Sequence, residues 1–317
     1  MKKSIAIVMD PIERIKPSKD TSFALLLEAQ RRGYALYYIE PGSLSIQNSK
    51  AYARLAQLTV NDDIDQYFKF GEFQRTALAS VSIILMRKDP PFDDQFLYDT
   101  QILSIAEGEG VMVVNNPQGL RDMNEKLAAL QFPQCCPETL VSRSLLELKA
   151  FIEQHRDTVV KPLDGMGGKS IFRIRHGESN VNVILETLTG SGNLVLAQKY
   201  IPEITQGDKR ILLIDGEPVP YALARIPQGD EFRGNLAAGG LGCGQPLSER
   251  DYWIAREVGP WLKERGMLFV GLDVIGDYLT EVNVTSPTCA RELDKQFGLN
   301  IAGLLFDAIE ARLVADE

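Results

Sequence analysis

The fold is decided by the stretch Val159-Val160-Lys161-Pro162-Leu163-Asp164-Gly165-Met166-Gly167-Gly168-Lys169-Ser170, which is followed by Ile171-Phe172-Arg173-Ile174. Apolar residues on both sides of a glycine-dense turn predict two antiparallel strands joined by a mobile loop. Three glycines within four residues let backbone N–H groups approach an anion, and Lys161 supplies a compact positive charge. The stretch therefore predicts a phosphate-binding hairpin, with an ordinary flexible hairpin as the alternative.

Two better-known nucleotide loops do not fit this stretch. A Walker A loop ending at Gly168-Lys169-Ser170 requires glycine where Leu163 stands, and a helix where the sequence predicts a strand. A Rossmann turn beginning at Gly165 requires a third glycine where Ser170 stands. Any phosphate site here is therefore of a different kind.

The composition is typical of a globular chain of two or three domains. The chain has 317 residues, 44% of them hydrophobic and 24% charged, with no apolar run long enough to span a bilayer. The net charge of −9 argues against nucleic-acid partners, because a phosphate backbone needs a basic surface. The four cysteines form no disulfide framework, and Lys2-Lys3 leads directly into a strand rather than a signal peptide, so we expect a cytoplasmic protein.

The first part of the chain alternates strands and helices. Apolar runs predict strands at 4–9, 34–39, 81–86 and 111–114, and helical spacing predicts helices at 22–32, 94–107 and 122–130. This alternation predicts an α/β unit with a parallel sheet. Prolines at 133 and 137 interrupt the helical pattern after it.

Beyond residue 138 the pattern favours antiparallel strands. We expect helices at 145–155, 180–188, 249–265 and 300–313, a strand at 194–200, a hairpin at 210–221 turning at Asp215-Gly216, and a strand pair at 268–284. The segment 226–244 has six glycines and little periodicity. A long loop of this kind predicts either a closing lid or an inert insertion.

The strand pair at 268–284 carries a candidate metal site. Glu281 and Asn283 are two residues apart, so they point to one face. A two-residue turn at Gly276-Asp277 would turn Asp273 to the opposite face, whereas a three-residue loop that includes Tyr278 pairs it with Glu281, which we favour. Two carboxylates and an amide oxygen suit Mg²⁺, although polar residues on a solvated face would show the same pattern.

Cationic residues elsewhere suit an anionic substrate. Arg210 opens a predicted strand and offers a planar fork to a phosphoryl or carboxyl group, and Arg87-Lys88 follows a buried strand at the end where ligands bind. Arg225 and Arg233 lie in or beside the glycine-rich segment. Each of these, like Lys126, is also compatible with a solvated surface.

Five longer strings resemble one family. The chain is similar to the ATP-grasp ligases, and in particular to the bacterial glutathione synthetases, over nearly its whole length and in the right order, in Met86-Arg87-Lys88-Asp89-Pro90-Pro91, Lys161-Pro162-Leu163-Asp164-Gly165-Met166-Gly167-Gly168, Pro220-Tyr221-Ala222-Leu223-Ala224-Arg225-Ile226-Pro227, Arg233-Gly234-Asn235-Leu236-Ala237-Ala238-Gly239-Gly240 and Glu281-Val282-Asn283-Val284-Thr285-Ser286-Pro287-Thr288. It departs from the family at Cys136, where threonine is usual, and at 241–245.

The resemblance implies an α/β pre-ATP-grasp domain at 1–122, with a parallel sheet. It also implies an ATP-grasp fold of two α+β subdomains that clasp ATP, at 123–200 and 201–317, the latter with a lid loop at 226–244. It implies a carbon–nitrogen ligase that joins γ-glutamylcysteine to glycine through an acyl phosphate, using ATP and Mg²⁺, with Mn²⁺ as an alternative. Small molecules are the expected partners, with no nucleic acid and no membrane, and the expected assembly is a homo-oligomer, a tetramer.

The family's functional residues transfer to matching positions of this chain. Those implied for ATP are Lys126, Lys161, Gly165, Met166, Gly167 and Gly168 at the phosphates, Gln198, Tyr200 and Ile201 at adenine, and Asp208 at the ribose. Those implied for the metal are Asp273, Glu281 and Asn283. Arg210, Arg225, Arg233 and Lys161 are the implied catalytic residues, and Arg87, Asn235, Ser286, Thr288 and Glu292 the implied substrate contacts.

Three alternatives remain. The nearest is an ATP-grasp ligase with other substrates, and the second is an ATP-binding regulatory protein without turnover. An NAD-dependent oxidoreductase is disfavoured, because Met9-Asp10-Pro11 stands where a glycine-rich turn is required.

Overall fold

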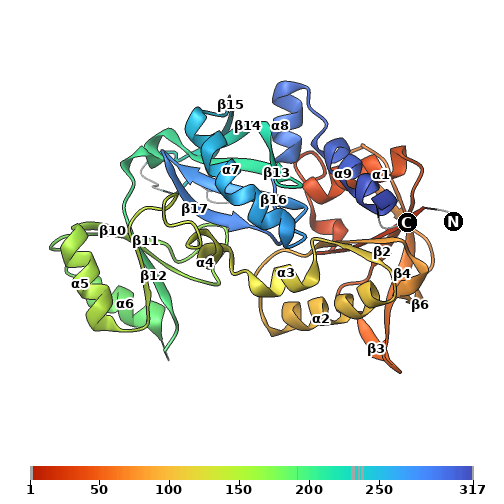
Figure 1. Ribbon diagram of the computed structural model, residues 1–317, viewed down its shortest axis with the longest axis horizontal. Helices are drawn as coiled ribbons and strands as arrows, with labels where there is room; N and C mark the ends of the chain where they lie inside the picture. Colours follow the sequence, from red (N-terminus) through yellow and green to blue (C-terminus); the bar gives the residue numbers. More distant parts are fainter. Residues whose placement is uncertain (1–2, 191, 230–232, 235, 237–238, 316–317) are drawn as a thin grey trace.

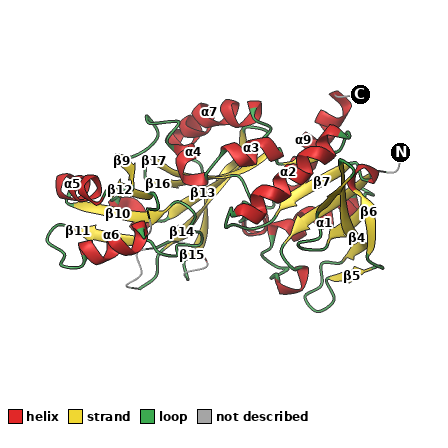
Figure 2. Ribbon diagram, turned by 90° about the horizontal axis from the view of Figure 1, so that it is seen from below, coloured by secondary structure: helices red, strands yellow, loops and turns green. Residues whose placement is uncertain are grey.

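The computed structural model describes residues 3–190, 192–229, 233–234, 236 and 239–315, and its strands form three sheets (Figure 1). Figure 2, turned by 90°, shows the sheet of the first part of the chain to one side of the other two. Helices alternate with strands in the first part of the chain, and the two later sheets are antiparallel, as expected for an α/β fold with an ATP-grasp part. Among the described residues, none of the helices is both long enough and apolar enough to cross a membrane.

The first sheet is parallel at its centre. Its strands are β1 (Ser4–Met9), β2 (Ala35–Ile39), β3 (Ser45–Gln47), β4 (Lys50–Val60), β5 (Phe68–Phe70), β6 (Gln74–Ala77), β7 (Ile83–Arg87) and β8 (Met112–Val114). β1 pairs in parallel with β2 and β7, and β7 with β8. All six residues of β1 are buried because alternate side chains enter two different cores, Ile5 and Ile7 on one face and Ala6 and Val8 on the other.

Strands β3 to β6 extend this sheet in antiparallel fashion, with β4 pairing with β2, β3, β5 and β6. The sequence analysis placed no element between the second strand and residue 81, so this extension was missed. β3, β5 and β6 are three or four residues long and partly exposed, so they carry little periodicity to detect.

Helices α1 (Thr21–Arg31) and α2 (Asp94–Gly108) confirm the predicted helices of this part. The single helix predicted at 122–130 is wrong at its start. The structure has two short helices, α3 (Pro117–Asp122) and α4 (Glu125–Ala129), separated by an extended Met123. Asn124 separates the two helices, because its side chain accepts hydrogen bonds from the N–H groups of Lys126 and Leu127 and so caps the start of α4.

The second sheet is fully antiparallel, in the order β11-β10-β12-β9. It contains β9 (Thr139–Ser142), β10 (Asp157–Pro162), β11 (Phe172–Arg175) and β12 (Val195–Lys199). Helices α5 (Leu145–His155) and α6 (Val181–Thr189) pack on one face over Val160, Ile174 and Ala197. The predicted hairpin is therefore confirmed, and its other face is left for the glycine-rich loop.

The third sheet is also antiparallel, in the order β15-β14-β13-β16-β17. It contains β13 (Asp208–Ile214), β14 (Glu217–Ile226), β15 (Leu241–Pro246), β16 (Phe269–Ile275) and β17 (Tyr278–Asn283). Helix α7 (Glu249–Glu264) lies between β15 and β16 in the chain, and α8 (Ala290–Phe297) and α9 (Ile301–Ala315) follow β17. Helix α9 packs against α1 of the first part.

The expected lid loop at 226–244 is shorter in the structure, because its last residues form β15 along β14. The glycines of β15 meet close neighbours: a Cβ on Gly244 would lie 2.3 Å from the Phe297 ring, and one on Gly242 would lie 3.3 Å from Leu223. Glycine content at these two positions reflects close packing and was wrongly read as part of a loop. Of the remainder, residues 230–232, 235, 237 and 238 lie outside the described residues.

The turn between β16 and β17 settles the register. Ile275 faces Tyr278, so the turn has two residues and the predicted three-residue loop is wrong. Asp273 nevertheless faces Glu281, because the register shifts by one residue between Val274 and Asp273. The β-bulge at this point re-aims one carboxylate toward the other.

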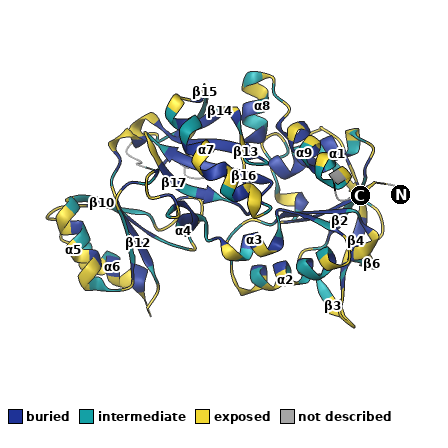
Figure 3. Cartoon of the chain, viewed as in Figure 1, coloured by how far each residue is buried: buried dark blue, intermediate teal, exposed yellow. Residues whose placement is uncertain are grey.

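Buried residues run along the strands of the first and third sheets, and exposed residues lie on the outer faces of α2, α5 and α6 (Figure 3). Two hydrophobic clusters each combine residues of the first and third sheets. Asn115, at the end of β8, adds polar contacts, since its side-chain amide donates to the carbonyls of Phe269 and Val284. The second sheet has a smaller cluster of its own.

Candidate active site

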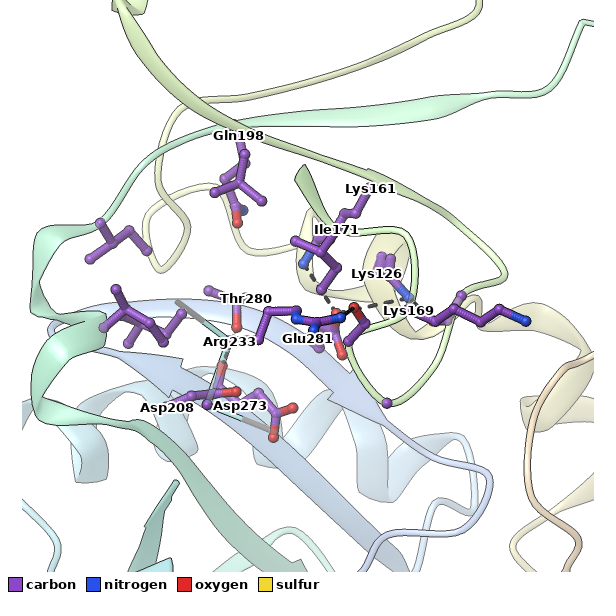
Figure 4. Close-up of a pocket in the computed structure, with 18 of the residues that line it drawn as sticks. Lys126, Lys161, Lys169, Ile171, Gln198, Asp208, Arg233, Asp273, Thr280 and Glu281 are labelled. Carbon is purple, nitrogen blue, oxygen red and sulfur yellow. Dashed lines mark hydrogen bonds and ion pairs between the residues drawn. The ribbon is translucent and has the colours of Figure 1, made fainter. Parts of the chain in front are cut away.

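A cleft lies between the glycine-rich hairpin of the second sheet and one face of the third (Figure 4). Its lining includes Lys126, Lys161, Gly165, Met166, Gly167, Gly168, Gln198, Tyr200, Ile201, Asp208, Arg233, Asp273 and Glu281. Every residue implied at the nucleotide thus lines one cleft.

Two segments far apart in the sequence meet here. Lys161 Nζ lies 3.1 Å from Glu281 Oε1, and Lys126 Nζ lies 3.8 Å from the same oxygen. Lys161 is at the end of β10, where strand alternation places it on the face away from α5 and α6. Burial raises the pKa of Glu281, but the charges of Lys161 and Lys126 outweigh burial and hold that pKa below its usual value. Two ammonium groups and a carboxylate are thereby concentrated at one point.

The glycine-rich loop covers this point with backbone. Gly167 and Gly168 have φ values of 61° and 81°, in the left-handed region that favours glycine. Lys126 Nζ donates to the carbonyl of Gly165 at 2.7 Å, and Arg233 Nη1 donates to the carbonyl of Gly168 at 2.9 Å. The loop is therefore held by cations from two other parts of the chain.

The third sheet faces the cleft with a buried chain of alternating charges. Arg210 makes a two-pronged contact with Asp273, Nε to Oδ1 at 2.5 Å and Nη2 to Oδ2 at 3.0 Å. Arg225 lies between two carboxylates, 2.9 Å from Asp273 Oδ2 and 2.5 Å from Asp208 Oδ2. Burial raises the pKa of Asp273, yet the two arginines outweigh burial and lower it overall, whereas burial dominates at Asp208 and raises its pKa to about 6.

Asp208 also has an oxygen, Oδ1, that is buried and makes no hydrogen bond to the described residues. An acceptor left unpaired in this way is costly unless a ligand supplies the donor. This oxygen is therefore a candidate to accept a hydrogen bond from a hydroxyl or N–H group of a ligand in the cleft.

The oxygen atoms implied for a metal come together. Asp273 and Glu281 face each other across β16 and β17, and Asn283 is two residues further along the same strand. The Asn283 amide donates to the carbonyl of Gly271 at 3.2 Å, which leaves its own oxygen as an acceptor. The described residues hold no group of three or more His, Cys, Asp and Glu side chains suited to a metal. Two carboxylates and one amide oxygen fit Mg²⁺, which takes its other ligands from water and phosphate.

A second cleft adjoins the first and shares Gly165, Met166, Gly167, Asp273 and Glu281 with it. Its other walls include Asp89, Glu125, Arg210, Arg225, Asn283, Thr285, Ser286, Thr288 and Cys289. An anion bound in the second cleft would therefore meet Arg210 and Arg225.

Two implied substrate contacts, Arg87 and Glu292, line neither cleft. Arg87 is buried and donates to Ser22 Oγ at 3.0 Å and to the carbonyl of Pro287 at 2.8 Å, so it holds the segment 286–288 from behind. Glu292 lies on α8, where burial raises its pKa and one oxygen has no hydrogen-bond partner among the described residues. Asn235 lies outside the described residues.

Sequence analysis missed Glu125. One of its oxygens accepts hydrogen bonds from the N–H groups of Val284 and Thr285 and from the Thr285 hydroxyl, at 3.1, 3.2 and 2.8 Å. This ties α4, which carries Lys126, to the strand end that leads into Ser286. An acidic residue in the first turn of a helix is common, so its sequence position gave no signal.

Solved structures show the fold. The structure matches the D-cycloserine synthetase DcsG with a TM-score of 0.68 at 14% identity, covering 98% of this chain and 100% of that one. It matches the ATP-grasp ligase PsnB, complexed with a minimal precursor, Mg and ADP, with a TM-score of 0.61 at 15% identity, covering 97% of each chain. Together with the cleft, these similarities define the class: the chain has the fold of the ATP-grasp ligases.

Sequence comparisons identify the family within this class. Residues 3–121 match the prokaryotic glutathione synthetase N-terminal domain, and residues 125–298 match the prokaryotic glutathione synthetase ATP-grasp domain. The chain is 66% identical over 312 residues to the glutathione synthetase of Xanthomonas axonopodis pv. citri (strain 306), covering 98% of this chain and 99% of that one. It is 59% identical over 310 residues to that of Salmonella typhimurium, covering 98% of both chains. The chain belongs to the prokaryotic glutathione synthetase family.

Proposed function

We propose that the two adjoining clefts are the active site at which this chain makes glutathione. Its family establishes the reaction: γ-glutamylcysteine and glycine are joined at the expense of ATP, with Mg²⁺. The observation that carries the assignment to this site is the meeting of Lys161 and Glu281 at 3.1 Å, where the first cleft opens into the second. ATP in one cleft and the dipeptide in the other would have their reacting groups at that junction.

ATP would lie in the first cleft under the glycine-rich loop. Lys126 and Lys161 would bind its phosphates, together with the backbone N–H groups of the loop. Gln198, Tyr200 and Ile201 would border adenine. The unpaired oxygen of Asp208 supports a contact with a ribose hydroxyl, which would supply the missing donor.

Asp273, Glu281 and Asn283 would hold Mg²⁺, which neutralises the charge of the phosphates during transfer. In the structure Arg210 pairs with the Asp273 carboxylate, and Lys161 pairs with the Glu281 carboxylate. Both cations would therefore shift toward phosphate oxygens when the metal binds. This exchange keeps every buried charge paired in both states.

The dipeptide would lie in the second cleft, against Ser286 and Thr288. Arg87 would act by holding that segment, and Glu292 and Asn235 would complete the substrate contacts. Arg225 and Arg233 would join Arg210 around the transferred group, and the loop after β14 would close as a lid to exclude water.

The reaction would proceed in two displacements. An oxygen of the cysteinyl carboxylate attacks the γ-phosphorus and the bond to ADP breaks, giving an acyl phosphate. The glycine nitrogen, as the free amine, then attacks the acyl carbon and the bond to phosphate breaks. The nitrogen gives up one proton, which the departing phosphate carries away, and the amide is formed. No side chain acts as nucleophile; Arg210, Arg225 and Lys161 stabilise the charges that develop.

The test is to measure ADP release and to detect the product by mass spectrometry. Glutathione should form with γ-glutamylcysteine and glycine, and release should stay near background when D-alanine or glutamate replaces the acceptor. Equal turnover with those acceptors would favour the alternative, a ligase with other substrates. Absence of product in a single turnover would favour a regulatory ATP-binding protein.

We further propose three domains at 1–122, 123–200 and 201–317, a homotetramer and a cytoplasmic location. The separate hydrophobic cluster of the second sheet supports the middle domain. Four free cysteines suit a reducing compartment. The tetramer rests on family resemblance, and light scattering of the purified chain would test it.

A further inference from the structure

Arg173 lines neither cleft, but it contacts Tyr200, which lines the nucleotide cleft. The centre of the Arg173 guanidinium lies 3.4 Å from the centroid of the Tyr200 ring. At that distance the cation lies over the aromatic face, an arrangement that arginine makes more often than lysine. Tyr200 lines the cleft, whereas Arg173 does not.

Arg173 is itself held in place. Its Nε and Nη2 donate to Oδ1 and Oδ2 of Asp157 at 2.9 and 2.6 Å. This two-pronged contact fixes the plane of the guanidinium, and only 21% of the Arg173 side chain is exposed. The orientation of the cation is therefore set before any ligand binds.

The sheet register brings these three residues together on one face. Arg173 on β11 faces Val159 on β10, which in turn faces Gln198 on β12, and both Val159 and Gln198 line the cleft. The Tyr200 N–H donates to the carbonyl of Asp157 at 3.0 Å. Asp157 thus contacts Tyr200 through its backbone and Arg173 through its side chain.

We propose that Arg173 is a positioning residue for nucleotide binding, because it holds the Tyr200 ring and the adjoining end of β12 in the orientation that borders ATP. The inference rests on the proposed function in that it takes ATP as the occupant of the cleft. Arg173 lines neither cleft, so we expect its effect to fall on binding and to leave the chemical step unchanged. Ordering one aromatic side chain in advance corresponds to a three- to tenfold gain in affinity.

The central variant is Arg173→Met, which keeps the apolar stem and removes both the cation and the fork. We expect KM for ATP to rise three- to tenfold, with kcat at saturating ATP within twofold of the parent. The dissociation constant for MgADP, measured by calorimetry, should rise by the same factor. Arg173→Lys, which retains a cation but not the two-pronged contact, should lie between the two.

The matched control is Arg175→Met. Arg175 lies two residues along the same strand, so it projects from the same face, but it is exposed. Its KM should equal that of the parent, and so should its affinity for MgADP. An equal rise in Arg175→Met, or an unchanged KM in Arg173→Met, would overturn the assignment.

A double variant separates positioning from a general loss of structure. Tyr200→Leu should raise KM for ATP, and adding Arg173→Met to it should raise KM no further, because the residue that Arg173 holds is already gone. Fully additive effects, or a fall in kcat equal to the rise in KM, would contradict the inference. If the parent chain makes no glutathione yet MgADP affinity falls as stated, the proposed function fails and this inference stands.

Discussion

The two walls of the nucleotide cleft hold their charges in different ways. On the third sheet, Asp208, Arg225, Asp273 and Arg210 form a buried chain in which each charge has an opposite neighbour. On the second sheet, the loop contributes backbone and the cations meet it through carbonyl oxygens. The strands of the third sheet thus present paired side-chain charges to the cleft, whereas the glycine-rich loop presents backbone that is held by cations from elsewhere in the chain.

Removing a charge from the rigid wall should have the largest effect. Asp273→Ala leaves Arg210 and Arg225 buried with too few anions, so we expect the free energy of unfolding to fall by about 3–5 kcal/mol. Ligation should be lost as well. Urea unfolding and an ADP-release assay measure the two effects, and an unchanged midpoint in urea would show that the buried charges are not coupled.

The same kind of change on the covering wall should separate activity from stability. Lys161→Ala should lower turnover by about 100- to 1,000-fold, because a cation is removed from the place where charge develops. The free energy of unfolding should fall by less than in Asp273→Ala, since Lys126 still lies 3.8 Å from Glu281 and leaves that carboxylate with a cationic neighbour. Lys149→Ala, on the exposed side of α5 and outside the lining of both clefts, is the control and should change turnover less than threefold. Wild-type turnover in Lys161→Ala would refute its role.

A backbone change tests whether the cover depends on glycine. In Gly168→Ala, the left-handed conformation at a φ of 81° would cost about 1–2 kcal/mol, so KM for ATP should rise about tenfold. Gly177→Ala serves as control: its φ is 85° and a Cβ there would meet nothing within 4 Å. The control should lose stability without any change in KM, and a rise in KM in both variants would remove the distinction.

The smallest effect should come from Glu107, a half-buried carboxyl for which the described residues supply no ion pair. Burial raises the pKa of Glu107 to about 7, and an Asn116 amide donating at 3.0 Å only partly offsets this. The folded chain therefore binds more protons than the unfolded chain between pH 4.5 and about 7, so stability falls as the pH rises through that window. Because the group is only half-buried, we expect Glu107→Gln to gain about 1 kcal/mol over the parent between pH 5 and pH 8. Urea unfolding at pH 5 and pH 8 measures this change. If the difference in urea midpoint between Glu107→Gln and the parent is the same at both pH values, the prediction is wrong.

Most of the fold was predictable where a pattern repeats along one segment. The apolar run of β1, the helical spacing of α5 and α7 and the glycine-rich hairpin all lie within one stretch of chain, and each was predicted to within a few residues. The pairing of Asp273 with Glu281 was also predicted, but for the wrong reason, since a bulge and not a longer turn produces it.

The sequence by itself determined the elements, the glycine-rich loop and the polar residue types that its strands carry, because periodicity and turn chemistry act between near neighbours in the chain. Only the tertiary structure decided that Lys161 lies against Glu281, 120 residues away, that Arg87 holds Pro287 from behind, and that the glycines of β15 pack against α8 and β14. Such contacts depend on how the separate sheets pack against one another. A local sequence pattern does not specify which distant residues will meet.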